Sequence, residues 1–289
     1  MSIEDRAVDP SGILLIDKPP GITSHDAVAM VRRALGTRKV GHAGTLDPMA
    51  TGLLVMGIGR ATRLLRFFGD LTKVYEGTMR LGVETATLDA DGTVTREAPI
   101  DGISDEAIDR AIVSKVGAST QRPPAFSAAK VGGRTLHDAA RKGELLEAPA
   151  RIVRVDRFER TGRARADVSF ICAVSGGTYV RVLAADVGAA LGCGAHLTAL
   201  RRTAIGPFTV KDATDPRDPG DPAPLERAVA HLPKLPVDHE EAIAASHGRI
   251  LGPAAIEGPY GVYDPDGRLL GVYRDDGGKA RPLVILAPA

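Results

Sequence analysis

Apolar residues recur with the period of β-strands in several separate stretches of the chain. The run Gly12–Ile16 is continuously apolar and leads into Pro and Gly, as expected of a buried strand that enters a turn. Lys73–Val83 alternates strictly between apolar and polar residues, which predicts a strand with one buried face. The same patterns predict further strands over Leu53–Ile58, Arg151–Phe158, Ala164–Val174 and His196–Phe208.

Between these strands the apolar residues recur at helical spacing. One helix is expected to begin at Thr23 or Ser24 and to end at Gly36, and another to begin at Ser104 and end at Gly117. Because strands and helices do not alternate regularly, the pattern favours an α+β fold over a doubly wound sheet. Further helices are predicted over Arg60–Phe68, near Asp138, over Thr178–Leu191 and over Leu225–Leu232.

Three segments lack any such period. Gly41–Gly52 is dense in Gly, Thr, Asp and Pro and is predicted to be a loop. Residues 121–148 are rich in Pro, Gly and basic residues and look like a mobile insert, whereas 212–224 reads as a Pro-rich linker. Beyond it, short strand-like runs flank Asp264-Pro265-Asp266-Gly267, which is typical of a hairpin. We therefore expect a large domain over 1–235 and a small β-rich domain over 236–289.

The charge of the whole chain hides a strong asymmetry. Its 289 residues carry a formal net charge of only +1, which alone argues against a partner with many phosphates. Residues 121–211 nevertheless carry +8, whereas 81–120 and 212–289 carry −5 each. A basic middle third of this kind is typical of a surface that binds a polyanion, although a solvated surface of mixed charge would look the same.

Composition narrows the class of protein further. The two cysteines, Cys172 and Cys193, form no metal-binding motif and suggest a reducing compartment. Met1–Pro10 is acidic and polar, unlike a signal peptide, and no apolar stretch is long enough to cross a membrane. We expect a cytoplasmic protein without a membrane segment or a bound metal.

Common catalytic motifs are incomplete. The stretch that begins at Gly57 starts like a dinucleotide fingerprint but has Thr62 at the third glycine position. The acidic turns at Asp89 and Asp264 lack the distal ligands of calcium loops. A Ser/His/Asp hydrolase built on Ser127 has no supporting G-x-S-x-G motif.

One carboxylate stands out by its surroundings. Asp47 lies in a loop of small residues, where the following Pro48 would make a turn former its ordinary role. Such a loop can also bring its backbone close to a large ligand, so that Asp47 could serve as nucleophile or base in a cavity. The residues of this segment alone leave both roles open.

Six motifs in order resemble one enzyme family. The segment Gly44–Gly52 resembles the catalytic motif of the bacterial tRNA pseudouridine synthase B family. The other five resemble its N-terminal motif, tyrosine strand, RNA-contacting insert, arginine motif and a late Leu-Arg-Arg-Thr motif. In the same order, they are Asp17–Ser24, Lys73–Tyr75 with Leu81-Gly82, Pro124–Gly133, Gly176–Arg181 and Leu200–Thr203. Together they span about two-thirds of the chain.

The resemblance implies a fold and a reaction. The fold is the pseudouridine synthase fold, with a mixed, mostly antiparallel central sheet and a small C-terminal domain of PUA type. The reaction detaches uracil 55 of the tRNA T-loop from C1′, rotates it and rejoins it through C5, with no cofactor. Asp47 matches the catalytic aspartate, Arg181 its paired arginine, and Asp89 a carboxylate that supports Arg181. Tyr75 matches the tyrosine that stacks on the target base, although core packing is the usual role of such a residue.

The resemblance also implies RNA-binding residues. A base inside a structured loop must be flipped out, and His42 matches the residue that fills the vacated space. Leu200 matches an apolar wall of the uracil pocket. The remaining expected contacts to substrate or RNA are Lys18, Gly44, Thr45, Lys130, Arg141, Tyr179 and Arg202.

Two departures and three alternatives accompany this interpretation. Leu136-His137 stands where the family has a tyrosine, so we assign His137 no role. The second departure is the C-terminal region, which is short and acidic. The alternatives are a tRNA-binding folding chaperone without catalysis, a guide-RNA-directed pseudouridine synthase, and a nucleoside or glycoside hydrolase. The expected partner is the T-arm of tRNA, bound by a monomer without a protein partner.

Overall fold

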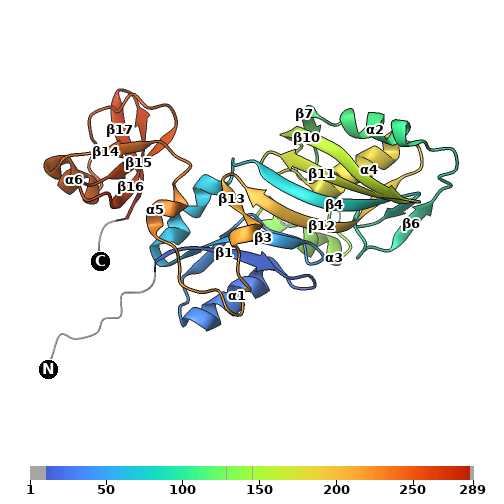
Figure 1. The fold of residues 1–289 in the computed structure, drawn as a ribbon, viewed down its shortest axis with the longest axis horizontal. Coiled ribbons are helices and arrows are strands. Elements are labelled where there is room, and N and C mark those ends of the chain that lie inside the picture. Colours follow the sequence, from blue (N-terminus) through green and yellow to red (C-terminus); the bar gives the residue numbers. More distant parts are fainter. Residues whose placement is uncertain (1–10, 128, 145, 287–289) are drawn as a thin grey trace.

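A computed structural model of the chain describes residues 11–286 except 128 and 145. The polar N-terminal stretch Met1–Pro10 lies outside the described residues. Within them, nine strands form a central sheet in the order β1-β3-β12-β4-β11-β10-β7, with β2 beside β3 and β13 beside β12 (Figure 1). Only β12 and β3 pair in parallel; the other neighbours are antiparallel. The predicted mixed, mostly antiparallel sheet is confirmed.

The strands of this sheet carry buried side chains at every second position where one face packs against helices. On β4, Tyr75, Met79 and Leu81 are buried, whereas Glu76 and Arg80 are exposed, as the alternation predicts. The bounds of the nine strands are β1 Gly12–Lys18, β2 Val40–Ala43, β3 Thr51–Ile58, β4 Lys73–Leu81, β7 Gly117–Gln121, β10 Arg151–Ala164, β11 Asp167–Val174, β12 Ala195–Ile205 and β13 Phe208–Thr209.

Helices cover the sheet in two places. Helices α2 (Asp105–Val113) and α4 (Val180–Ala190) pack on the apolar side chains of β4, β10 and β11. Helix α1 (Ser24–Leu35) packs on β1 and β3 at the other end of the sheet (Figure 1). Thr23 and Ser104 cap α1 and α2 with their side chains, and Gly36 ends α1 in the left-handed conformation.

Several element boundaries differ from the predicted ones. Val40–Ala43 is a strand rather than loop because it pairs with β3, and the helix after Ser104 ends at Val113 because its buried face stops at Ile112. The predicted strand Ala164–Val174 is broken at Arg165, whose φ of 56° turns the chain. Basic Arg60–Phe68 forms two 3-10 helices, η1 Gly59–Arg63 and η2 Leu65–Phe68, and helix α5 is shorter than expected, Leu225–Ala228.

Short elements follow β4 and occur in the described part of the insert. Strands β5 (Val83–Thr85) and β6 (Val94–Glu97) form a ribbon after β4. The predicted short helix near Asp138 is confirmed as α3, Leu136–Arg141. It follows the two-residue strands β8 (Lys130–Val131) and β9 (Arg134–Thr135).

The C-terminal part forms a separate lobe beside the central sheet (Figure 1). Its sheet has the order β14-β15-β16-β17, and the predicted hairpin around Asp264–Gly267 joins β15 to β16. Arg63 donates to the carbonyl of Ile285 at 2.6 Å, and an apolar cluster shared with η1 and η2 joins the lobe to the body. Its elements are β14 Lys234–Pro236, α6 His239–Ser246, β15 Pro259–Tyr263, β16 Leu269–Asp276 and β17 Lys279–Ile285.

The linker follows the outer side of β1. After the short helix η3 (Val210–Asp212), its backbone bonds to β1 at two points: Thr214 N donates to Leu15 O at 2.9 Å, and Ile13 N donates to Ala223 O at 2.9 Å. It is irregular, as its Asp- and Pro-rich sequence predicts, yet it is held along the sheet.

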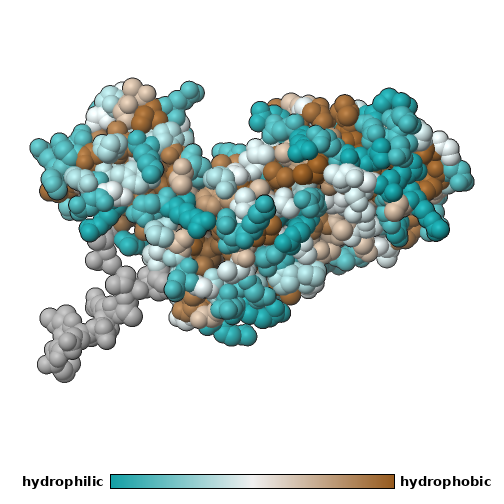
Figure 2. All heavy atoms as spheres, in the orientation of Figure 1, coloured by the Kyte–Doolittle hydropathy of each residue, from teal (hydrophilic) through white to brown (hydrophobic). Residues whose placement is uncertain are grey.

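The sequence predicts a protein without a membrane segment or a bound metal, and three features of the structure relate to this expectation. Hydrophilic residues cover most of the visible face, with apolar residues in small groups (Figure 2). No helix among residues 11–286 is long and apolar enough to span a bilayer. The described part of the chain likewise holds no cluster of His, Cys, Asp and Glu that could bind a metal ion.

Candidate active site

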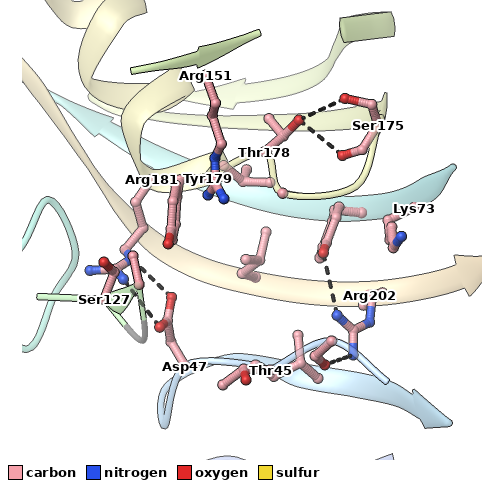
Figure 3. A pocket seen from close by; sticks show the side chains of 17 residues that line it. Thr45, Asp47, Lys73, Ser127, Arg151, Ser175, Thr178, Tyr179, Arg181 and Arg202 are labelled. Atoms are coloured by element: carbon pink, nitrogen blue, oxygen red, sulfur yellow. Dashed lines mark hydrogen bonds and ion pairs between the residues drawn. The ribbon is translucent and has the colours of Figure 1, made fainter. Parts of the chain in front are cut away.

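A cavity of about 330 Å³ opens where the Asp47 loop faces the start of α4 (Figure 3). Its walls come from segments far apart in the sequence: the loop before β3, strands β4 and β12, the insert, the start of β10 and the turn before α4. The residues that line it are Gly44, Thr45, Leu46, Asp47, Lys73, Tyr75, Ser127, Ala129, Arg151, Ser175, Gly177, Thr178, Tyr179, Val180, Arg181, Leu200 and Arg202.

Asp47 is held by a two-point ion pair. Arg181 Nε lies 2.9 Å from Asp47 Oδ2, and Arg181 Nη2 donates to Asp47 Oδ1 at 3.1 Å. The arginine side chain is only 3% exposed, whereas that of Asp47 is 34% exposed and faces the cavity. The guanidinium thus fixes the direction of the carboxylate and leaves it accessible to a ligand.

The remaining donors of Arg181 are also used. Nη1 lies 3.1 Å from Asp89 Oδ2 and donates to the Thr87 carbonyl at 2.7 Å, while Nη2 also donates to the Phe126 carbonyl of the insert at 2.9 Å. The structure therefore brings Asp89 to the far side of Arg181. A buried charge with this many partners is fixed in orientation.

Burial dominates the titration of Asp47. Loss of hydration raises the pKa of its carboxyl above the ordinary value, Arg181 opposes the rise, and Asp89 adds to it. The side chain stays in contact with the cavity, so a ligand that excludes water would strengthen every charge interaction there.

Lys18 supports the Asp47 loop from below. Its fully buried ammonium donates to the carbonyls of Ile22 at 2.7 Å, Pro19 at 3.0 Å and Pro48 at 3.3 Å. Burial lowers the pKa of Lys18 to about 8. Its donors are thus occupied within the protein, although the sequence motif suggested a contact to RNA.

Arg202 organises the opposite wall. This side chain is 1% exposed and donates to Leu53 O at 2.7 Å and to Gly44 O at 2.9 Å. Its Nη1 donates to the Tyr75 hydroxyl at 3.4 Å. Gly44 has a φ of +82°, which its lack of a Cβ allows, so its carbonyl can face the guanidinium. Arg202 therefore connects Tyr75 to the loop that carries Asp47.

The other predicted residues fall into two groups. Thr45, Tyr179 and Leu200 line the cavity. His42 does not line it: it lies on β2 in edge contact with His25, its Nδ1 is buried without a hydrogen-bond partner, and burial lowers its pKa to about 4. Lys130 and Arg141 line a separate hollow on the insert with Arg134 and Lys142.

Other residues at the cavity had not been identified from the sequence. Lys73 donates from β4 to the carbonyls of Phe68 and Gly69, and Ser127 places a buried hydroxyl without a hydrogen-bond partner at the wall. Arg151 reaches the cavity from the start of β10. Lys73 and Ser127 lie within motifs that resemble the family, and this position could have identified them as candidates. Arg151 follows the insert and lies in none of the motifs.

Three family models match consecutive parts of this chain. Residues 32–180 match the family model described as TruB family pseudouridylate synthase (N terminal domain). Residues 181–217 match the tRNA pseudouridylate synthase B C-terminal domain, and residues 232–287 match tRNA Pseudouridine synthase II, C terminal.

Relatives extend the match to nearly the whole chain. The tRNA pseudouridine synthase B of Mycobacterium sp. (strain KMS) is 46% identical over an alignment of 287 residues, and the match covers 96% of this chain and 97% of that protein. The tRNA pseudouridine synthase B of Thermobifida fusca (strain YX) is 45% identical, over 96% of this chain and 98% of its own length.

Solved structures share the fold. A Cbf5-Nop10-Gar1 complex contains a chain with a TM-score of 0.72 and 26% identity, covering 96% of this chain and 85% of its own. An H/ACA RNP bound to a substrate RNA gives 0.71 and 23%, over 96% and 85%. The fold is that of the pseudouridine synthases, which are isomerases. Within that class, the chain belongs to the TruB family of pseudouridylate synthases.

Proposed function

We propose that this protein converts a uridine of tRNA to pseudouridine, and that the target is uridine 55 in the T-loop. The relatives named tRNA pseudouridine synthase B support the class of substrate, since they match 96% of this chain. The observation that carries the chemistry is the Asp47 carboxylate, oriented by a buried arginine and open to a cavity.

The reaction needs a group that acts on the sugar. The bond between C1′ and N1 of uracil breaks, the base turns, and C5 bonds to C1′; C5 loses a proton and N1 gains one, so no electrons leave the substrate. Ionised Asp47 either adds to C1′ or removes a proton from C2′, and both roles need the charged form that Arg181 favours.

Two further residues meet the base in this proposal. Tyr75 presents its ring to the cavity and its hydroxyl to Arg202, which suits stacking on uracil and help with proton transfer. Leu200, on the neighbouring strand, closes the pocket with an apolar wall. Thr45 and Tyr179 complete the contacts around the nucleotide.

RNA reaches the cavity across the insert. Lys130 and Arg141 are exposed there and gather with Arg134 and Lys142 around one hollow, which suits contact with phosphates of the T-arm. The target base flips out into the cavity, and His42 on β2 braces the space that it leaves. We propose no contact for Lys18, because its donors are occupied.

The proposed organisation follows the sequence interpretation. The catalytic domain comprises 1–235 and the C-terminal domain of PUA type 236–289; the family match over 232–287 and the separate four-stranded sheet support this division. The proposal includes a protein that acts as a cytoplasmic monomer without cofactor or protein partner.

Mass mapping of tRNA after a reagent has selectively derivatised pseudouridine, which otherwise has the mass of uridine, tests the proposal. After incubation of unmodified tRNA with the purified protein alone, pseudouridine is expected at position 55 and nowhere else in the T-arm, with no free uracil. A folding chaperone would yield no pseudouridine, a guide-directed enzyme would act only with added guide RNA, and a hydrolase would release uracil. Any of these three results would replace the proposed function.

A further inference from the structure

Four cationic side chains line the cavity, and three of them form hydrogen bonds or ion pairs within the protein. Arg181 binds two carboxylates and two carbonyls, Arg202 binds two carbonyls and the Tyr75 hydroxyl, and Lys73 binds two carbonyls. The fourth is Arg151. Among the residues that line the cavity Asp47 is the one carboxylate, so the site carries an excess of positive charge.

The guanidinium of Arg151 has N–H donors, but no acceptor among the described residues binds them. Its Nε is buried without a hydrogen-bond partner, and within the described residues the guanidinium makes neither an ion pair nor a hydrogen bond. Its Cζ lies over the ring of Tyr179, 4.7 Å from the centroid. That contact stabilises the positive charge but satisfies none of its N–H groups, which reach into the cavity (Figure 3).

The surroundings hold this side chain in place. Gln121 accepts from Tyr179 N at 2.7 Å and donates to Tyr179 O at 3.1 Å, which fixes the residue whose ring lies under the guanidinium. Gly177 has a φ of +81°, and a Cβ there would stand 3.3 Å from Arg151 Cζ. The arginine is therefore placed before any ligand arrives, and a buried donor without a partner is costly unless a ligand or water satisfies it.

The chemistry of the substrate offers the missing acceptor. Tyr75 and Leu200 already account for the base and Asp47 for the sugar, so the backbone of the flipped nucleotide is what remains to be bound. A guanidinium presents a planar fork of donors that matches a phosphate. We propose that Arg151 binds a phosphate group that flanks the target uridine; the proposal rests on the proposed function, because it takes RNA as the ligand.

The test couples the side chain to the phosphate. Binding of a synthetic T-arm hairpin is measured by fluorescence anisotropy for the wild type and Arg151→Ala, with the phosphate on either side of the target replaced in turn by an uncharged methylphosphonate. We expect Arg151→Ala to weaken binding about 10- to 100-fold. One of the two methylphosphonates should weaken binding of the hairpin to the wild type by a similar factor. When this methylphosphonate is combined with Arg151→Ala, the affinity should fall no further than with either change alone.

Arg154 supplies the matched control. It lies on the same strand, is exposed, and its guanidinium pairs with Asp156 at 2.8 Å, away from the cavity. Arg154→Ala should change binding about twofold or less, as expected for an exposed ion pair. Arg151→Lys should retain part of the affinity, because it keeps the charge and loses the fork.

Three results would overturn the proposal. In the first, Arg151→Ala binds the hairpin as tightly as the wild type does. In the second, neither methylphosphonate weakens binding to the wild type. In the third, the two losses of affinity multiply when Arg151→Ala is combined with the methylphosphonate. The last would mean that Arg151 contacts the base or only supports Tyr179. Pseudouridine formation is measured separately: a wild type that binds the hairpin and shows the coupling but makes no pseudouridine contradicts the proposed function and leaves the phosphate contact intact.

Discussion

The cavity around Asp47 and the surface of the insert use the same cationic residue types in different ways. In the cavity, Arg181 and Arg202 are almost completely buried, and their donors are bound by carboxylates and carbonyls of the protein. On the insert, Lys130 and Arg141 are exposed beside a hollow. A buried cation that is bonded to protein groups positions those groups, whereas an exposed one is available to a ligand. The predictions below test this division.

Asp47→Asn is expected to have the largest effect. The amide keeps the shape of the side chain but can neither attack C1′ nor remove a proton, so kcat should fall at least about 1,000-fold. Pseudouridine formation under single-turnover conditions measures the loss. The control, Asp101→Asn, changes an exposed carboxylate. Retention of more than a tenth of the activity would remove Asp47 from the catalytic role.

Arg181→Lys tests whether the buried arginine positions the carboxylate. Lysine keeps the charge but cannot contact both oxygens of Asp47 together with Asp89, so kcat should fall about 100-fold. Binding of the T-arm hairpin should hardly change. Arg110→Lys, on the exposed side of α2, is the control. If KM rose and kcat stayed constant, Arg181 would belong with the RNA-binding cations.

The pH dependence of kcat follows from the burial of Asp47. Its raised pKa means that protonation begins at a higher pH than for an ordinary aspartate, and protonation removes the active form. The acidic limb of the profile should therefore lie above the usual aspartate range, with activity falling about tenfold per pH unit below it. Asp89→Asn removes a negative neighbour and should shift the limb to lower pH. A limb at the ordinary aspartate pKa would contradict the argument from burial.

Changes on the insert should have the smallest effect. Lys130→Ala and Arg141→Ala should each raise KM about three- to tenfold near physiological salt and lower the slope of log K against log salt by about one. Lys279→Ala, exposed on the acidic C-terminal lobe, serves as control and should change neither quantity. An unchanged slope for both insert variants would show that these side chains do not contact phosphates.

The sequence predicted the parts of the fold that depend on local pattern. The alternation along β4 placed Met79 inside, Ser104 and Thr23 cap their helices, and the turn at Asp264–Gly267 joins two strands. Each of these features depends on neighbouring residues alone. The boundaries that were wrong depend on distant partners: Val40–Ala43 is a strand because β3 lies beside it.

The same distinction applies to the site. The motifs identified Asp47 and Arg181, and the structure brings them together across 134 positions. The motifs did not reveal that Lys18 is buried and bonded to the Asp47 loop. Its partners are backbone carbonyls, which every residue has, so the sequence does not show which ones it contacts. Arg151 escaped for another reason: an arginine beginning a strand has no distinctive local pattern, and only the folded chain places it over Tyr179.

The linker along β1 also matters for solubility. Strand β1 ends the central sheet, and its free side would otherwise expose unpaired N–H and C=O groups to other chains. The bonds from Ile13 and Leu15 to the linker occupy part of that side. A shortened protein without the C-terminal lobe should therefore keep residues up to Ala223, because a cut at the start of the linker would uncover a strand that can template aggregation.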